Sequence, residues 1–401
     1  MKYSENTSQN DRIKTHKKRL SIGADYNLIA IVVILCAIGL VMVYSTSYYT
    51  AVDTFGDRFY YLRKQLIATF VGLILMLFIS KIINVKYLNS KFLIYFFLFF
   101  SLFLMLLVLS PLGFEAYGAR RWISIPVFGS VQPSELFKIA YILFISWYLS
   151  RRKTDNSNIK TVIHVAVISM LFVVYIWKVT DHLSAGIIVF LIGIVMSFVA
   201  NKNTVRLSIF FVAVISIGYL FLRFISKNLV KMSNSFRINR ILVWTNPEEY
   251  IDRGGYQIIQ ALYAIGSAGF IGRGLGKSTQ KLGFIPEAQN DMIIAIFCEE
   301  LGILGLIVLL MLFGYLLYRL LLIAKNCEDL FSFLVVVGIF AHISIQTVLN
   351  FCVVLNVIPT TGITMPFISY GGSSIVFLLS EIGLALALSN RIKRRVYKDF
   401  N

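Results

Sequence analysis

Long apolar runs constrain this chain of 401 residues more than any other feature. A helix needs about 20 mostly apolar residues to cross the roughly 30 Å hydrocarbon core of a bilayer. Ten runs of that order occur, at 28–48, 64–80, 91–110, 135–150, 161–178, 183–200, 206–225, 291–318, 330–350 and 372–390. With 58% hydrophobic and 14% charged residues, the chain has more apolar surface than a water-soluble fold of this length buries. The sequence therefore predicts an all-α, polytopic integral membrane protein with about ten transmembrane helices.

The net charge of +18 could suggest a nucleic-acid-binding protein, but the distribution of the cations along the chain does not. They gather between alternate spans and in the terminal tails, as in a membrane protein. They are Lys14, Lys17, Lys18 and Arg19, then Lys81, Lys86 and Lys91, then Arg151, Arg152 and Lys153, and last Arg391, Lys393, Arg394 and Arg395. If ten helices alternate, all of these lie on one side, which is cytoplasmic by the positive-inside rule. We expect a basic cytoplasmic tail at 1–27, a membrane domain at 28–390, a second basic cytoplasmic tail at 391–401, and no nucleic acid partner.

Two predicted outer segments depart from this charge pattern. The first, 111–132, carries Arg120 and Arg121, and the second, 226–290, is a long loop between the seventh and eighth spans. The cations of the second segment are Lys227, Lys231, Arg237, Arg240, Arg253, Arg273, Lys277 and Lys281. Long loops escape the positive-inside rule, which is one explanation. The alternative is an outward-facing groove for an anionic ligand.

Glycines in the second segment favour the groove. The runs at 254–257 and 266–277 would let backbone amides approach an oxyanion, with Arg273 and Lys277 beside them. The sequence Gly276-Lys277-Ser278 ends like a nucleotide-binding P-loop, but no predicted strand precedes it and it lies on the side of the membrane away from ATP. A nucleotide site is therefore not predicted.

Acids at membrane boundaries mark further candidate residues. Asp291 directly precedes a long apolar run, where a carboxylate loses hydration and is seldom placed without a function. Glu135 and Lys138 share a helix face just after Pro133, either as a structural ion pair or as the lining of a polar cavity. Glu299 and Glu300 lie further along the Asp291 helix, toward the predicted bilayer middle, and are expected to form a buried polar network.

The stretch 357–374 holds two prolines and three glycines between apolar flanks, which forbids an ordinary helix in the segment 351–371. Irregular backbone is tolerated at membrane depth only where protein or a water-filled cavity satisfies it. We therefore expect a re-entrant outer segment, with Ser369 and Tyr370 bordering the cavity.

Several motifs together resemble one family, the SEDS proteins of bacterial shape, elongation, division and sporulation. The motifs are Val41–Ser45, Gly118–Trp122, Gln132–Lys138, Gly255–Gln257, Ala264–Gly266, Pro286–Ala288, Asp291, Glu299–Gly302 and Pro366–Ser374. Val41-Met-Val-Tyr-Ser45 is more similar to the division and sporulation branch (FtsW, SpoVE) than to the elongation branch (RodA). One departure is Thr180-Asp181-His182-Leu183-Ser184, which replaces a Pro-Asp-Leu-Gly-like motif of the family.

The resemblance implies a peptidoglycan glycosyltransferase in the bacterial cytoplasmic membrane. Its substrate would be lipid II, a disaccharide-pentapeptide on undecaprenyl pyrophosphate, and its partners a class B penicillin-binding protein and other division or sporulation membrane proteins. The family's essential aspartate falls on Asp291. The substrate-binding residues are expected to be Arg120, Arg121, Glu135, Lys138, Arg237, Arg240, Gln257, Lys281, Glu287, Ser369 and Tyr370.

The expected chemistry needs only one carboxylate. Asp291 would accept the acceptor hydroxyl proton while undecaprenyl pyrophosphate leaves with inversion at the anomeric carbon. Glycosidases need a second acid because their leaving group is an alcohol, whereas Arg, Lys or a divalent cation such as Mg²⁺ or Mn²⁺ can hold departing phosphates. A lipid II flippase, an elongation-type polymerase and a scaffold without Asp291 chemistry are the alternatives.

Overall fold

The computed structural model of the chain describes residues 19–21, 25–83, 85–116, 119–125, 129–152, 159–201, 236–390 and 393–395. Eight described helical segments are long and apolar enough to cross a membrane. They are α1 (Tyr26–Phe55), α2 (Tyr60–Ile82), α4 (Lys91–Leu106) with the 3-10 turn η1 (Leu107–Leu109), α6 (Ile159–Thr180), α7 (Leu183–Ala200), α11 (Ile293–Asn326), α12 (Leu330–Val354) and α13 (Gly372–Ser389). The prediction of a helical, multi-pass membrane protein is confirmed.

Two of the ten predicted spans are not among these eight. The run 135–150 does form a helix, α5 (Pro133–Arg151), but polar residues such as Glu135 and Lys138 lower its mean hydropathy, and it is not among the eight. The run 206–225 lies outside the described residues, so the count of ten stays a prediction.

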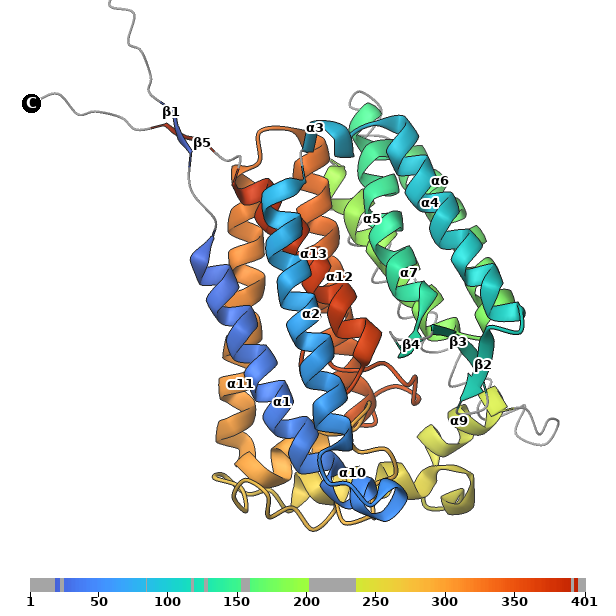
Figure 1. Ribbon diagram of the computed structural model, residues 1–401. Helices are drawn as coiled ribbons and strands as arrows, with labels where there is room; N and C mark the ends of the chain where they lie inside the picture. The colour runs from blue at the N-terminus through green and yellow to red at the C-terminus, as the bar shows by residue number, and fades with distance from the viewer. Residues whose placement is uncertain are drawn as a thin grey trace, which may run out of the picture.

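The helices form two groups joined by α12 (Figure 1). In one group α13 packs along α2, while α1 packs on α2 and α11; in the other, α4, α5, α6 and α7 pack together. Glycines allow the closest of these approaches, because a Cβ at Gly383 would lie 2.7 Å from the Met76 carbonyl oxygen and one at Gly72 would lie 2.6 Å from Leu379. α12 contacts α5 and α7 as well as α11 and α13, so it forms the centre of the bundle.

Small sheets qualify the all-α prediction. β2 (Gly113–Ala116), β3 (Ala119–Ile125) and β4 (Gly129–Val131) form an antiparallel sheet before α5. β1 (Arg19–Ser21) pairs with β5 (Lys393–Arg395) at the opposite end of the bundle, and the short helix α3 (Val85–Leu88) precedes α4.

The loops gather at one end of the bundle, which we call the loop end. There α9 (Phe236–Thr245), the 3-10 turn η2 (Ile251–Arg253) and α10 (Gly255–Gly266) lie across the helix ends (Figure 1). The predicted re-entrant segment 351–371 begins later than expected, since α12 continues to Val354. After that the chain is irregular up to α13, and its apolar residues Ile363, Met365, Phe367 and Ile368 are buried.

Helix lengths place the hydrocarbon boundary at the loop end. At the far end, an ion pair of 2.6 Å joins Asp25, which caps α1, to Arg319 of α11. About 20 residues span the hydrocarbon core, so counting that far from Asp25 along α1 reaches Ser45. The same count from Asp329, which caps α12, reaches Leu349. Both counts end at the loop end, where Ser45 bonds Glu300, and Asn350, next to Leu349, bonds the Asp291 backbone.

Candidate active site

Asp291 lies at this boundary, two residues before α11 begins, and is partly buried. Its carbonyl oxygen accepts a hydrogen bond of 2.8 Å from Asn350 Nδ2 in α12. The same amide donates to the carbonyl oxygen of Ile363 at 2.8 Å. One buried side chain therefore holds the backbone of Asp291 and the backbone of the 355–371 loop together.

The carboxyl group of Asp291 has an altered acidity. Burial, which disfavours the charged form, raises its pKa to about 6. Its own backbone hydrogen bond and the positive charge of Arg240 lower the pKa, and the carboxylate of Glu287 raises it. A carboxyl group with a pKa near 6 is mostly ionised at neutral pH and is a stronger base than an ordinary aspartate.

Glu287 fixes the turn that leads into Asp291. Its carboxylate accepts hydrogen bonds from Gln289 Nε2 at 3.0 Å and from Asn290 Nδ2 at 2.9 Å. The backbone of Glu287 has a positive φ of 52°, a conformation that costs a non-glycine residue energy and persists where neighbours impose it. Gln257 of α10 donates to the carbonyl oxygen of Pro286 at 3.1 Å. The structure thus places Glu287 and Gln257 beside Asp291 in contacts that shape its turn, and their role in substrate binding stays a prediction.

The 355–371 loop contributes Tyr370 to the same place. Its backbone N–H donates to the carbonyl oxygen of Gln289 at 2.9 Å, and its ring packs edge-on against Tyr61 with centroids 5.0 Å apart. The hydroxyl of Ser369 instead accepts from the backbone N–H of Met365 at 2.9 Å. Tyr370 therefore bonds the turn that leads into Asp291 and packs on α2, whereas the hydroxyl group of Ser369 stabilises the loop itself.

A second set of residues converges on His182, between α6 and α7. The imidazole Nδ1 lies 3.0 Å from Gln132 Nε2, at the start of α5. Burial lowers the pKa of His182 well below its ordinary value, and the charges of Arg121, Lys138 and Arg240 lower it further. Positive charges from β3, α5 and α9 therefore act on His182 and favour its neutral form, and the charge of Arg240 also acts on Asp291. His182 was not among the predicted site residues, although its departure from the family motif was a signal.

The Glu135–Lys138 pair forms with 2.8 Å between Oε1 and Nζ, and both side chains are buried. Ser374 of α13 also donates to Glu135, at 3.3 Å. This contact joins the two groups of helices, so the structural ion pair predicted from the sequence is present. The alternative expectation, that the pair lines a polar cavity, stays a prediction.

Other predicted ligands have other roles. Arg120 donates to the carbonyl oxygens of Ser110 and Gly113, at 3.3 and 3.0 Å, and so braces the sheet. The side chain of Arg237 lies outside the described part of the chain. Lys281, predicted to hold phosphates, is 7% exposed and forms an ion pair of 2.8 Å with Glu300. This correction follows from the loop's fold, which turns Lys281 inward.

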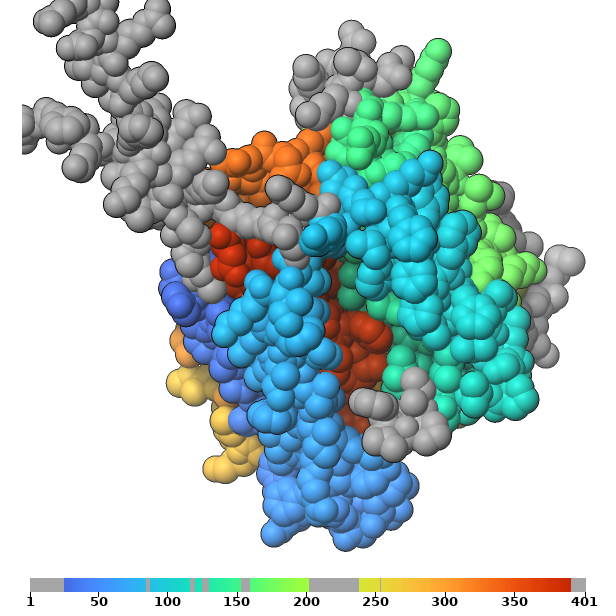
Figure 2. Space-filling view, turned by 45° about the horizontal axis from the view of Figure 1, so that its top comes forward, coloured from blue at the N-terminus to red at the C-terminus, as the bar shows by residue number. Residues whose placement is uncertain are grey.

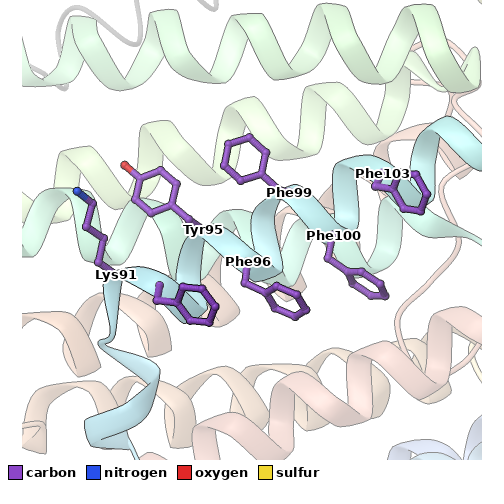
Figure 3. A pocket seen from close by; sticks show the side chains of 7 residues that line it. Lys91, Tyr95, Phe96, Phe99, Phe100 and Phe103 are labelled. Carbon is purple, nitrogen blue, oxygen red and sulfur yellow. The ribbon is translucent and has the colours of Figure 1, made fainter.

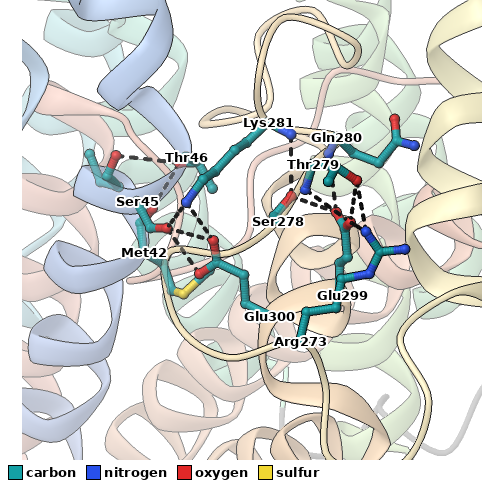
Figure 4. A network of polar contacts seen from close by, with 11 residues as sticks. Met42, Ser45, Thr46, Arg273, Ser278, Thr279, Gln280, Lys281, Glu299 and Glu300 are labelled. Carbon is teal, nitrogen blue, oxygen red and sulfur yellow. Dashed lines mark hydrogen bonds and ion pairs between the residues drawn. The ribbon is translucent and has the colours of Figure 1, made fainter.

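Glu299 and Glu300 organise the loop that precedes Asp291 (Figure 4). Glu299 accepts from the backbone N–H groups of Thr279 and Gln280, from two hydroxyl groups and from Arg273. Ser45 of α1 donates to both oxygens of Glu300, at 2.7 and 2.9 Å. The carboxylate of Glu299 is thus the anion that the backbone amides of Thr279 and Gln280 bind. The predicted buried network is present, but it lies at the hydrocarbon boundary rather than toward the bilayer middle.

A hollow opens between α2 and α4, with α13 visible at its floor (Figure 2). The α4 side of this region carries an open groove of about 770 Å³, lined by Lys91, Phe92, Tyr95, Phe96, Phe99, Phe100 and Phe103 (Figure 3). Phe92 and Phe99 are 76% and 62% exposed. An aromatic surface of this extent at membrane depth suits acyl or isoprenoid chains. Among the described residues, no group of three His, Cys, Asp or Glu side chains is placed to hold a metal ion.

Comparison with known proteins identifies the family. The profile of the FtsW/RodA/SpoVE cell cycle proteins matches residues 26–394. Stage V sporulation protein E of Bacillus subtilis (strain 168) is 38% identical over 91% of this chain and 96% of that protein. The probable peptidoglycan glycosyltransferase FtsW of the same strain is 34% identical over 94% of this chain and 93% of that protein.

Solved structures agree. A chain from a structure described as "Structural coordination of polymerization and crosslinking by a peptidoglycan synthase complex" has a TM-score of 0.73 at 27% identity, covering 92% of this chain and 98% of that one. The rod shape determining protein RodA of Thermus thermophilus has a TM-score of 0.64 at 24% identity, covering 92% of this chain and 98% of that one, and supports the fold alone. The chain therefore belongs to the FtsW/RodA/SpoVE family of cell cycle proteins, as its motifs predicted.

Proposed function

We propose that this protein is a peptidoglycan glycosyltransferase that polymerises lipid II at the outer face of the bacterial cytoplasmic membrane. The observation that carries the proposal is Asp291, a partly buried carboxyl group with a pKa of about 6 at the hydrocarbon boundary, near a cluster of three cations. The names of the relatives, which include peptidoglycan glycosyltransferases and a sporulation protein, support the same activity.

In the proposed reaction, Asp291 accepts the proton of the acceptor sugar's hydroxyl group. The hydroxyl oxygen bonds to the anomeric carbon of the donor as the bond from that carbon to the pyrophosphate oxygen breaks. The anomeric centre inverts, and undecaprenyl pyrophosphate leaves with the bonding electrons. Pyrophosphate departs without protonation if its charge is stabilised, so one carboxylate suffices.

The leaving group would be held by Arg121 and Arg240, with Lys138 as the third cation that acts on the same region. Lys138 already neutralises Glu135 at 2.8 Å, so its own net contribution is small. Arg can bind two phosphate oxygens through one planar guanidinium group, which suits a pyrophosphate. His182 is surrounded by these cations and stays neutral, so the cluster's positive charge remains on groups that bind phosphate.

Membrane geometry supports a lipid-linked substrate. The aromatic groove on α4 would accept its isoprenoid tail from the bilayer, while the sugars reach Asp291 at the loop end. The solved peptidoglycan synthase complex supports a class B penicillin-binding protein as partner. The basic segments support cytoplasmic termini, which places the loop end outside.

A divalent cation such as Mg²⁺ or Mn²⁺ would fit this site as an ion carried by the substrate's phosphates. Mg²⁺ in phosphate sites commonly takes one or two protein carboxylates, and Asp291 and Glu287 are the carboxylates that face the turn. When bound, the ion would supply additional positive charge to the departing pyrophosphate.

Polymerisation of labelled lipid II by purified protein tests the proposal, with and without a class B partner. We expect glycan strands from the parent and none from Asp291→Asn, which preserves shape but cannot accept the proton. Asp252→Asn, in the exposed turn η2, is the matched control and should retain full activity. Full-length strands from Asp291→Asn would refute Asp291 as the base. No strands from the parent, with or without the partner, would refute the enzyme assignment and favour the flippase, which lipid II translocation in vesicles would then show.

A further inference from the structure

The loop Ser267–Lys277 is fastened to α11 where that helix is interrupted. Gly302 breaks α11 with a φ of 69° and a ψ of −172°. Here Ile303 and Leu304 donate backbone hydrogen bonds of 3.1 Å to the carbonyl oxygens of Gly269 and Phe270. In return, the N–H groups of Arg273 and Gly274 donate to the carbonyl oxygens of Glu299 and Glu300, both at 2.9 Å. The loop is therefore held at a fixed height along the helix.

The side chains at the tip of this loop are apolar and exposed. Phe270 is 62% exposed and Ile271 is 77% exposed. Beside them on α11, Ile303 and Leu304 are 51% and 50% exposed. The apolar surface continues along α11 through Ile307, Val308 and Met311, which are all exposed. A helix face of this kind on a membrane-spanning segment faces lipid.

The height of the tip follows from the helix lengths. Leu304 lies 15 residues from Arg319 in the unbroken part of α11, or about 22 Å at 1.5 Å per residue, which is short of the roughly 30 Å hydrocarbon core. The backbone of Phe270 bonds Leu304, so the tip lies at or just inside the boundary. Arg273 is on the other side of the loop, where it pairs with Glu299 at 3.1 Å, and Lys277 is exposed nearby. Apolar groups thus point along the lipid-facing surface while charged groups stay at headgroup level.

We propose that the Ser267–Lys277 loop is a membrane-interface anchor, with Phe270 and Ile271 inserted among the acyl chains of the leaflet at the loop end. The occupant of this surface is phospholipid, since the patch is continuous with the lipid-facing side of α11. The loop also joins the network of Glu299, Glu300 and Lys281 that precedes Asp291. The anchor therefore sets the height of the Asp291 turn relative to the leaflet. This inference rests on geometry alone and does not require the proposed enzyme activity.

Tryptophan fluorescence in lipid nanodiscs tests the anchor. Phe270→Trp and Ile271→Trp are each placed in phosphatidylcholine and phosphatidylglycerol nanodiscs, with or without brominated acyl chains, and the signal of the four native tryptophans is subtracted with the parent protein. Ile307→Trp, one turn beyond Ile303, provides the reference within the acyl chains. Asp252→Trp, in the exposed turn η2, provides the aqueous reference.

We expect both loop tryptophans to be quenched by the brominated chains nearly as strongly as Ile307→Trp, with emission shifted to the blue of Asp252→Trp. Water-like emission without quenching in both loop variants would overturn the proposal. So would quenching that a purified partner protein abolishes, because the patch would then be a protein-docking surface. Having two adjacent variants keeps the test decisive if one of them fails to fold.

Discussion

Asp291 should lower the stability of the protein at neutral pH. Its pKa in the folded state, about 6, lies above its ordinary value of 3.8, because burial disfavours the carboxylate. The protonated acid therefore stabilises the fold fully below pH 3.8, and this contribution is lost as the pH rises through 6. Asn cannot ionise, so Asp291→Asn should melt at a higher temperature than the parent at pH 7.5. Its free energy of unfolding should be larger by on the order of 1 kcal/mol after allowance for partial exposure. Thermal melts at pH 7.5 and pH 4 measure this, and a lower melting temperature for the variant at pH 7.5 would contradict it.

The same acidity predicts how polymerisation depends on pH. A general base works as the carboxylate, so kcat/KM should fall tenfold per pH unit below the pKa of about 6 and level off above it. The measurement is the initial rate of lipid II polymerisation between pH 5 and 8 at limiting substrate, in buffers of constant ionic strength. A flat profile over that range would exclude Asp291 as the base that titrates.

The Glu135–Lys138 pair allows a clean test of a buried interaction. Removing one partner leaves an uncompensated charge, so Glu135→Gln or Lys138→Met alone should cost about 3–5 kcal/mol of stability. The double variant should recover most of that loss, since neither charge then remains buried. Melting temperatures of the four proteins measure the coupling. Losses that simply add in the double variant would show that the two side chains do not depend on each other.

At the scale of single residues, the sequence located Asp291 because an acid beside an apolar run is conspicuous in any membrane chain. It could not place Lys281, whose ion pair with Glu300 depends on how the loop folds back on α11. It also missed His182, which is recognisable only once α5, β3 and α9 bring their cations around it. Residue types were readable from the sequence, whereas partners distant along the chain were not.

At the scale of elements, the break in α11 should tolerate no side chain at Gly302. A Cβ there would lie 2.4 Å from the Gly272 nitrogen, and its φ of 69° disfavours any L-residue. Gly302→Ala should therefore cost several kcal/mol and detach the Ser267–Lys277 loop. Gly314→Ala is the matched control on the same helix, because nothing lies within 4 Å of its Cβ position. The measurements are the melting temperature of each variant and the hydrogen exchange of the loop. Equal stability of the two variants would contradict the close packing of the loop against the break in α11.

Most helices were predictable because hydropathy is a local property, and all eight candidate spans coincide with predicted runs. The three-stranded sheet before α5 was not predicted, because its strands are short and owe their form to pairing with each other. The glycines at 266–277 were predicted to let backbone amides approach a bound oxyanion. What approaches is the carbonyl oxygen of Glu300, since a Cβ at Gly272 would lie 2.4 Å from it. Composition alone could not distinguish that partner from a bound anion.

At the scale of the whole molecule, the described helices show at which end of the bundle each of the connecting segments between them lies. α7 begins at the loop end, where Ser184 donates to the carbonyl oxygen of Thr361 at 2.8 Å, and its 18 residues carry it to the opposite end. α9 is again at the loop end, where Arg240 donates to Thr360 at 3.1 Å. A span at 206–225, which lies outside the described residues, would account for this return, and ten crossings would place both termini on one side of the membrane.

Cysteine labelling of intact cells tests this topology, starting from a variant in which the four native cysteines are replaced. A membrane-impermeant maleimide should react with Asp252→Cys, in the exposed turn η2 at the loop end, without lysis. Lys325→Cys, exposed in the last turn of α11, should react only after lysis, because the basic segments hold that end in the cytoplasm. Reversed labelling would put Asp291 on the cytoplasmic side, where a polymerase of exported lipid II could not act. Equal labelling of both cysteines in intact cells would contradict two-sided placement and the helix lengths that locate the hydrocarbon boundary.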